Sequence, residues 1–394
     1  MEKHFYTRYA AWNRRGGDGE HMDIKTVRFF SPDYKFLGET DDAIVIYTSQ
    51  WHTYGQFEIH LQQMQPYVKK DNRIVFDNDF RKNGIIKYIQ IDDSNDGGVV
   101  IKGFSLLWIL THRITVPDSG KDVTSYNAPV EDIMTDLVLR NAIKSPQAAR
   151  NIPNLAVAGS QGRGERIQYQ TRYDVLCDEL SDLSRLSMLG IAIRMNPDNK
   201  QDIFEVLEGV DRSIEQNVRS PVVFRRAYDN IGKTVYTLND SLTKNCAYAA
   251  GQGEGADRAV YVVGDELSGA ERKEIFIDAR DIEDSSALPE RGRTKLSEYK
   301  PQENFETAII ADQYQSSWYM GDRLTIIDDD TGITLSDYVV EIEETVDESG
   351  YEVIPTLGVP EGTIGSGSVS GGSSGSGGSG DRTYTVTKLT PDIT

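Results

Sequence analysis

Cysteine and histidine are scarce in this sequence, and each shortage excludes a class of protein. Its 394 residues include two cysteines and five histidines. Cys177 and Cys246 lie outside any CxxC pattern and have no histidine nearby, which disfavours a zinc site. Two cysteines also exclude a disulfide-stapled scaffold. We therefore expect two buried, reduced thiols.

Long apolar runs are also lacking. The longest candidate, Gly103 to Leu110, is far shorter than the ~20 residues that span a bilayer. The stretch before Met22 lacks the apolar core of a signal peptide. We therefore expect no membrane span and synthesis as a soluble chain in a cytoplasm.

Positive charge is in deficit, because 42 Lys and Arg stand against 62 Asp and Glu, a formal net charge of −20. A protein that binds nucleic acid through a whole surface needs clustered cations that displace counterions from the phosphates. The acidic excess therefore predicts no specific nucleic-acid binding. It is compatible with a protein that lines a path for DNA without holding it.

Composition and periodicity divide the chain into six segments. The run GSGSVSGGSSGSGGSG is typical of a flexible linker, and the strand-like DRTYTVTKLTPDIT after it is too short to fold alone. Met22 resembles a second start, so the residues before it are set apart from the fold. The expected segments are an N-terminal extension (1–21), a first barrel-like β domain (22–120), an α+β domain (121–220), a second barrel-like β region with a small insertion (221–358), the linker (359–380) and a strand-like tail (381–394).

Apolar and polar residues alternate through most of 23–110 and 221–358, as they do in half-buried strands. In AIVIYTS, for example, Ile44 and Ile46 share one face, and VVIKGFSLLWIL is interpreted as a further strand. One helical turn from Thr294 interrupts the second region. Short turns at even spacing favour barrels or split barrels.

Between these two regions the apolar spacing becomes helical. Asn127 and Pro129 predict the start of one helix, with a cap and a first-turn proline. A second helix is expected to open at Thr171 and Asp174 and to end at Gly190. The expected fold class is therefore α+β and predominantly β, with two barrel-like β domains and an α+β insertion.

Three motifs match binding or catalytic patterns only in part. Residues 371–375 fit GxSxG, but linker replaces the strand and helix that flank a nucleophile elbow. Residues 251–256 fit GxGxxA, but a strand follows where phosphate capture needs a helix N-terminus. The loop 92–97 begins like a calcium loop, yet Gly103 stands where the bidentate glutamate belongs. Ordinary connections explain all three better, so no cofactor and no metal site is predicted.

Reactive side chains form no catalytic constellation in the sequence. His52 and His60 are joined to no Ser, Cys or Asp in a readable pattern. Glu341 and Glu343 lie on one face of a strand, and glycoside hydrolysis uses paired acids, but 62 acidic residues produce such pairs by chance. No catalytic residue is predicted, and we expect that the chain is not an enzyme. Two aromatic pairs could bind a sugar or a partner protein: Trp51 with Tyr54, and Trp318 with Tyr319. Packing in the core or at an interface explains them better.

Several separated segments agree, in order, with a known family. They are FFSPDYKFLGETDDAIVIYTSQWHTYGQFEIHL, RYDVLCDELSDLSRLSMLGIAI, AYAAGQGEGADR and YEVIPTLG. Together they resemble the tail-associated (Tal), baseplate-hub proteins at the tail tip of siphophages, the bacteriophages with long non-contractile tails, and of their prophages. The resemblance covers about residues 22–358.

This resemblance implies a structural hub protein, a component of the virion at the tail tip that is assembled in the host cytoplasm. The family looks like the central hub of contractile baseplates, a homotrimer whose pseudo-sixfold ring closes the tail tube. The implied partners are the distal tail protein, the tail tube and tape measure proteins, and receptor-binding proteins. The ring would provide the path for DNA ejection.

Two alternatives stay open, a tail-associated cell-wall hydrolase and a carbohydrate-binding adhesin. The hydrolase would need a catalytic part in the acidic loops or beyond the linker, and nothing after Gly380 is long enough to be such a module. No catalytic residue carries over from the family, because the matching segments are structural. The adhesin would use exposed aromatic residues, with Trp51 and Trp318 as the candidates.

Overall fold

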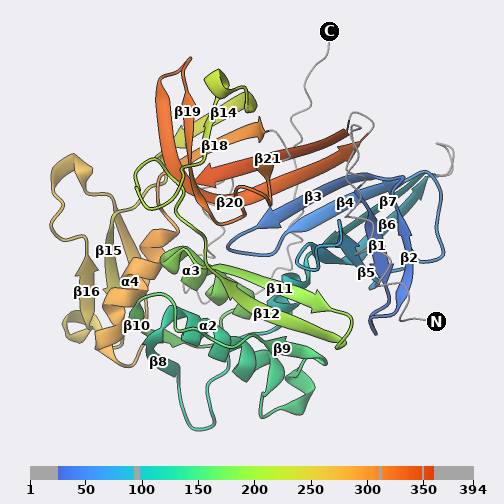
Figure 1. Ribbon diagram of the computed structural model, residues 1–394. Helices are drawn as coiled ribbons and strands as arrows, with labels where there is room; N and C mark the ends of the chain where they lie inside the picture. Colours follow the sequence, from blue (N-terminus) through green and yellow to red (C-terminus); the bar gives the residue numbers. More distant parts are fainter. Residues whose placement is uncertain (1–24, 93–97, 310–312, 348–349, 359–394) are drawn as a thin grey trace.

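The computed structural model of the chain describes residues 25–92, 98–309, 313–347 and 350–358 (Figure 1). The fold is α+β and predominantly β, so that prediction is confirmed. The predicted N-terminal extension (1–21), the linker (359–380) and the tail (381–394) lie outside the described residues.

Strands dominate the first and last thirds of the chain; α2 and α3 lie between these two parts, and α4 lies among the strands of the last third. The first region contains β1 (Val27–Phe30), β2 (Phe36–Thr40), β3 (Ile44–Gln50), β4 (Gln56–Leu61), β5 (Arg73–Phe76), β6 (Asn83–Asp92), β7 (Gly98–Phe104) and the 3-10 helix η1 (Leu106–His112). The middle region contains β8 (Thr124–Pro129), α2 (Val130–Val138), the π-helical η2 (Leu139–Ile143), η3 (Ala148–Arg150), β9 (Leu155–Val157), β10 (Arg166–Thr171), α3 (Leu176–Ser187), β11 (Gly190–Asn196) and β12 (Gln201–Leu207). The last region contains β13 (Val223–Arg225), η4 (Arg226–Tyr228), β14 (Ile231–Asn239), β15 (Cys246–Ala250), η5 (Gly255–Asp257), β16 (Val260–Val263), η6 (Gly269–Glu271), β17 (Glu274–Asp278), η7 (Ser285–Ala287), α4 (Leu288–Ser297), β18 (Gln302–Ile309), β19 (Arg323–Asp328), β20 (Ile333–Asp347) and β21 (Gly350–Gly358).

One large sheet joins the two β regions. Its main order is β14-β18-β21-β20-β3-β4-β7-β6-β5-β1-β2, and β19 with β13 branches from β20. The regions meet where β20 pairs antiparallel with β3, with Glu341 opposite Gln50 and Val346 opposite Val45 (Figure 1). Within the described residues no strand path closes on itself. The expected two barrels are thus an open sheet, because the long strand β20 is shared between the regions.

The helices differ from the sequence prediction at their ends. Pro129 precedes α2 as predicted, but Asn127 belongs to β8, where it pairs with Gln168 instead of capping a helix. Thr171 ends β10, so α3 begins later than predicted, at Leu176. It also ends before Gly190, at Ser187, because Met188 adopts a left-handed φ of 57°.

Two further segments depart from the strand interpretation. In VVIKGFSLLWIL, β7 ends at Phe104 and the remainder forms η1, whose Leu106, Leu107 and Leu110 are buried at helical spacing. The predicted helical turn at Thr294 is the end of a longer helix, α4, which begins at Leu288. Alternation of apolar residues alone therefore overestimates strand length where a helix packs on a core.

Trp51, immediately after β3, connects all three regions through hydrogen bonds. Its backbone N–H donates to the carbonyl of Val340 in β20 at 2.9 Å, and its carbonyl accepts from the N–H of Ile191 in β11 at 3.0 Å. The indole Nε1–H donates to the carbonyl of Met188 at 3.1 Å. One residue thus fixes the large sheet against the middle region.

Two glycines make room for the Trp51 ring, which is 3% exposed. A Cβ placed on Gly190 would lie 2.6 Å from the ring, and one on Gly321 would lie 2.2 Å from it. Gly190 comes from the middle region and Gly321 from the last, so the indole packs between backbones of both. The Trp51 ring leaves no room for a side chain at either position, and Gly321 also has a positive φ of +85° that favours glycine.

We expect Gly321→Ala to destabilise the protein more than Gly332→Ala. Both glycines have positive φ, +85° and +72°, so each substitution costs about 1–2 kcal/mol of left-handed strain. Only the Gly321 methyl group meets the Trp51 ring, which adds about 1–3 kcal/mol of overpacking. Chemical denaturation of both variants measures the difference, and equal losses of stability would contradict the packing role of Trp51.

Candidate functional site

Eight consecutive strands of the large sheet, from β14 to β6, form one surface that crosses the junction of the two β regions, and every neighbouring pair among them is antiparallel. Cross-strand partners share a face of a sheet. One face is apolar and packs on the cores, with Ile59 and Ile342 fully buried. The opposite face, here called the polar face, carries Glu58, Lys102, Glu306, Glu341 and Glu343.

Glu341 is the titratable centre of the polar face. Burial raises its pKa to about 7, and the negative charges of Glu306 and Glu343 act in the same direction. The Gln50 side-chain amide donates a hydrogen bond to it across the β3–β20 junction, which opposes the shift. The predicted pair Glu341 and Glu343 does share one face, so the structure brings it together at the junction of the two β regions.

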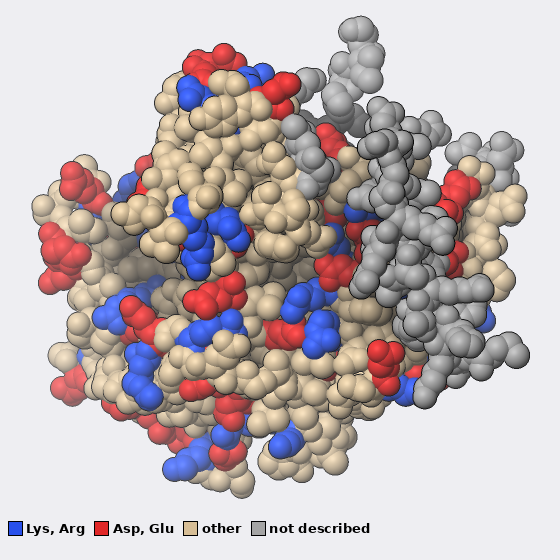
Figure 2. Space-filling view, in the orientation of Figure 1, with Lys and Arg blue, Asp and Glu red and all other residues tan. Residues whose placement is uncertain are grey.

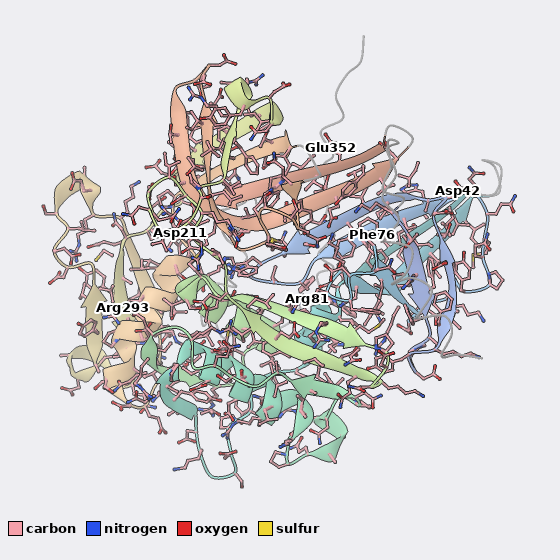
Figure 3. All side chains as sticks on the ribbon, viewed as in Figure 1. Asp42, Phe76, Arg81, Asp211, Arg293 and Glu352 are labelled. Atoms are coloured by element: carbon pink, nitrogen blue, oxygen red, sulfur yellow. The ribbon has the colours of Figure 1, made fainter. Side chains whose placement is uncertain are left out.

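The apolar face carries a buried ion pair at the same junction. Lys82, just before β6, places its Nζ 2.6 Å from Oε1 of Glu344 in β20, and the two side chains are 4% and 0% exposed. The Tyr351 hydroxyl donates to the same oxygen at 2.5 Å. The Lys82 ammonium also lies 5.8 Å from the centre of the Phe76 ring, which Figure 3 labels within the first β region. The pair therefore joins the first and last regions through two buried side chains.

A cavity of about 480 Å³ lies beside this ion pair, where the three regions meet. Residues of all three line it, among them Trp51, Leu207 and Tyr319. Figure 3 shows Arg81 at this boundary, between the first β region and β11–β12. Three cationic side chains line the cavity, and each forms an ion pair with a carboxylate. The pairs are Arg81–Glu205, Lys82–Glu344 and Arg163–Glu131. The cavity thus offers little spare charge for a phosphate or a carboxylate ligand.

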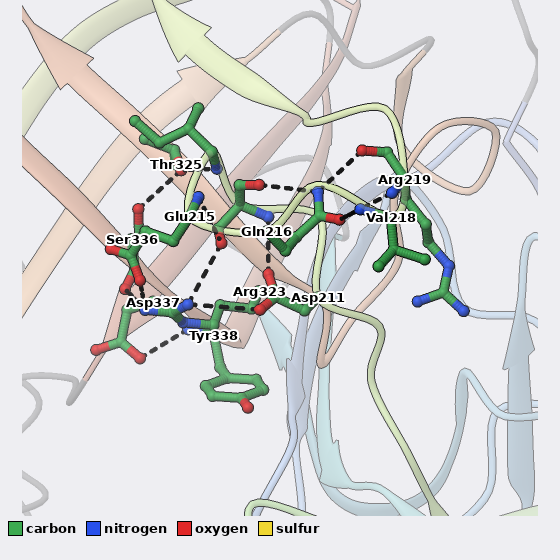
Figure 4. A network of polar contacts seen from close by, with 12 residues as sticks. Asp211, Glu215, Gln216, Val218, Arg219, Arg323, Thr325, Ser336, Asp337 and Tyr338 are labelled. Atoms are coloured by element: carbon green, nitrogen blue, oxygen red, sulfur yellow. Dashed lines mark hydrogen bonds and ion pairs between the residues drawn. The ribbon is translucent and has the colours of Figure 1, made fainter.

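A polar network holds the segment that leads from the middle region into the last one (Figure 4). The Arg323 guanidinium in β19 contacts Glu215 at 2.6 Å and Asp211 at 3.5 Å. The Gln216 side chain accepts from the backbone N–H groups of Val218 and Arg219, both at 2.8 Å. This connection is therefore fixed to the large sheet by its own side chains.

His52 and His60, the two histidines considered in the sequence analysis, each contact one neighbouring side chain. The Nδ1 atom of His52 lies 2.7 Å from the Ser184 hydroxyl, and burial, with a smaller effect of Arg185 and Lys300, lowers its pKa to about 3. His52 is therefore neutral at physiological pH and forms part of the packing against α3. His60 contacts Glu58 at 2.7 Å on the polar face.

The aromatic candidates belong mainly to the core. Trp51 is 3% exposed and Trp318 is 0% exposed, so neither ring is available to stack on a sugar. The core interpretation of these residues is confirmed, and the adhesin loses its two named contacts. Tyr319, at 47% exposed, is the accessible member of its pair.

The sequence motifs have equally plain outcomes. Residues 251–256 connect β15 to the antiparallel strand β16, as predicted, and no phosphate-binding helix follows within that described stretch. Cys177 and Cys246 are free and buried, which confirms the thiol prediction. Residues 371–375 and all of the 92–97 loop except Asp92 lie outside the described residues. Among the residues that are described, no group of three His, Cys, Asp or Glu side chains could hold a metal ion.

Sequence reasoning missed the Lys82–Glu344 pair. The sequence did contain one indication of this pair, because Glu344 interrupts the apolar face of β20 between Ile342 and Val346. A charge on a buried face requires a partner, but the sequence does not show that the partner lies 262 positions away. Long-range pairing of this kind needs the fold.

Acidic and basic side chains are interspersed over the face of the molecule that Figure 2 shows, and no broad basic patch gathers there. This distribution agrees with the acidic net charge of −20. No helix in the described parts of the chain is both long and apolar enough to cross a membrane.

The family described as Siphovirus ReqiPepy6 Gp37-like protein matches residues 26–359. The chain belongs to this family. The prediction of a siphophage tail-protein family is therefore confirmed. No curated protein matches the sequence of this family member.

Solved structures show a similar fold. The 43 kDa tail protein of prophage MuSo2 from Shewanella oneidensis has a TM-score of 0.54 at 11% identity, covering 86% of this chain and 100% of that chain. The tail protein from Neisseria meningitidis MC58 has a TM-score of 0.54 at 14% identity, covering 86% and 98%. At these identities the likeness concerns the fold alone.

Removing the charge of Lys82 is expected to destabilise this family member strongly. Lys82→Met leaves the Glu344 carboxylate buried without its cation, which costs about 3–5 kcal/mol, whereas Lys82→Met with Glu344→Met recovers most of that loss. Arg225→Ala removes the pair with Asp329 at the surface, whose side chains are 34% and 37% exposed, and should change the stability little because solvent screens that pair. Urea denaturation measures the stability of all three variants. If the double variant were no more stable than Lys82→Met, the loss would not come from an unpaired Glu344 carboxylate, and the role given to the ion pair would be refuted.

The raised pKa of Glu341 predicts a pH dependence of stability. Between the unperturbed pKa of 4.5 and about 7, the folded state keeps a proton that the unfolded state loses, so rising pH lowers the free energy of unfolding. Glu341→Gln removes this contribution and is expected to be more stable than wild type at pH 8 by roughly 3 kcal/mol. Denaturation curves from pH 4 to 8 measure it. The exposed Glu352→Gln on β21 is the control, and parallel profiles for wild type and Glu341→Gln would count against the prediction.

Proposed function

We propose that this chain is the structural hub of a phage or prophage tail tip, a homotrimeric ring that closes the tail tube. Membership of a siphophage family and a fold shared with two solved tail proteins, one of them from a prophage, support a role in the tail. In this role the chain binds the distal tail protein, the tail tube and tape measure proteins and receptor-binding proteins through surfaces, not through an active site.

The observation that carries the proposal is the single sheet shared by both β regions. The β3–β20 pairing, the buried Lys82–Glu344 pair and the packing of Trp51 all cross the boundary between them. A tube-closing subunit has to hold two β regions at a fixed angle, because a ring closes only if every copy has the same shape. These three contacts supply that rigidity.

Charge supports the use of the ring as a path for DNA. Three copies carry 3 × −20 = −60 formal charges. A negative channel repels phosphates, so DNA would pass during ejection without adhering. The four glutamates of the polar face make it the better candidate for the channel wall, with Lys102 bound to Glu58 at 2.9 Å.

A structural role also fits the chemistry of the described residues better than a hydrolytic one. A general base near neutral pH is most often a histidine. His52 is buried and neutral, and His60 is bound to a glutamate. No observation in the described part of the chain favours the cell-wall hydrolase.

Electron microscopy of the purified full-length chain tests the proposed function. We expect class averages with three-fold symmetry and a central channel, and a particle mass of three copies. Incubation with purified host cell wall provides the functional control and is expected to release neither peptides nor sugars. A symmetry other than three-fold, or hydrolysis of the cell wall, would require a different function.

A further inference from the structure

The first end of the eight-strand stretch is an unprotected strand edge. β14 pairs with β18 on one side, and no described strand pairs with it on the other. Val235 is 55% exposed and Leu238 is 61% exposed along this nine-residue strand. Long exposed edges with apolar side chains invite pairing with another chain, and proteins usually shield them.

The second end is the outer half of β6. Its first residues pair with β5, and the last backbone contact on that side joins Ile86 to Asn72 and Asp71. Beyond Ile86, β6 pairs within the described residues only with β7. Tyr88 is 47% exposed and Ile91 is 51% exposed in this part. A second apolar edge therefore lies at the opposite end of the same stretch.

The directions of these two edges match. Eight strands with every neighbouring pair antiparallel place β14 and β6 in opposite directions. If β14 of one copy lies beside β6 of the next, the new pair is again antiparallel, and the alternation continues from copy to copy. Such a junction also keeps the polar face on one side of the combined sheet.

The other end of the sheet lacks this match. Three further antiparallel pairings lead from β6 through β5 and β1 to β2, so β2 runs in the same direction as β14. A β14–β2 junction would be parallel within an antiparallel sheet, and β2 is only five residues long with an irregular register against β1. The outer half of β6 is the better acceptor.

We propose that copies of this chain join edge to edge, with β14 of one copy pairing antiparallel with the 87–91 part of β6 in the next copy. The partner is a second copy because the chain itself carries both complementary edges. The contact uses two different patches, so it is heterologous and generates a closed ring when the rotation per copy closes. The inference rests on the proposed hub function and names the interface by which that ring forms.

Lysine substitutions at the exposed positions test this pairing in the full-length chain. Variant one carries Val235→Lys and Leu238→Lys on β14, and variant two carries Tyr88→Lys and Ile91→Lys on β6. Val260→Lys, 50% exposed on β16 in a separate sheet, is the matched control. Sedimentation velocity measures mass, and circular dichroism with thermal unfolding checks that each variant is folded.

Wild type and the Val260→Lys control are expected to assemble, and each edge variant is expected to fall to the mass of one copy. An equimolar mixture of the two edge variants should form dimers and nothing larger, because each pair retains a single intact junction. Edge variants that keep the wild-type mass would overturn the pairing. So would dimers of variant two alone, because they would show β14 pairing with itself.

Hydrogen exchange on the wild-type chain supplies a test without substitutions. Amides of β14 and of residues 87–91 are expected to exchange more slowly in the assembly than in a diluted monomer, and unchanged exchange would overturn the pairing. A three-fold ring that survives both edge substitutions would leave the hub function intact and remove only this interface. If wild type formed an open filament that the edge substitutions abolish, the β14–β6 interface would stand, but the closed ring of the proposed function would not.

Discussion

The packing of Trp51 between two glycines is the constraint on which the arrangement of this molecule depends. The indole lies against Gly190 of the middle region and Gly321 of the last, and it follows directly on β3 of the first. Its backbone hydrogen bonds extend to β20 and β11. A large planar side chain in a slot built from bare backbone has one orientation, so it helps to fix the angles among the three regions. The first and middle regions also share one core cluster, in which Phe30 and Leu106 pack with Leu180, whereas the last region has a cluster of its own around Trp318.

A second constraint acts along β20, whose two halves belong to different pairings. Residues 333–338 pair with β19, whereas the part from Val339 onward pairs with β21 and, through residues 341–346, with β3. The Lys82–Glu344 pair then crosses from β20 to the start of β6. These contacts couple the first and last regions so closely that a hinge between them would have to break strand pairing and expose a charge.

The fold class and most strands could be predicted from the sequence, because alternation in segments such as AIVIYTS reports a half-buried strand locally. Both main helices were also visible, from Pro129 and from the leucines of α3. Their ends were not, since Asn127 and Thr171 satisfy hydrogen bonds in the β8–β10 pair instead of capping. The junction between the two β regions could not be predicted from the sequence, because neither the glycine slot for Trp51 nor the partner of Glu344 follows from neighbouring residues.

The shared sheet also determines when the protein can finish folding during its synthesis. Gln50 and Glu341, which bond across the β3–β20 junction, are 291 positions apart. At about 5–20 residues per second, β20 leaves the ribosome roughly 15–60 s after β3. Throughout that interval the nascent chain presents β3 with an open edge, and Trp51 lacks its slot. The region made first is therefore completed last, and the growing chain is the form of this protein that most needs a chaperone.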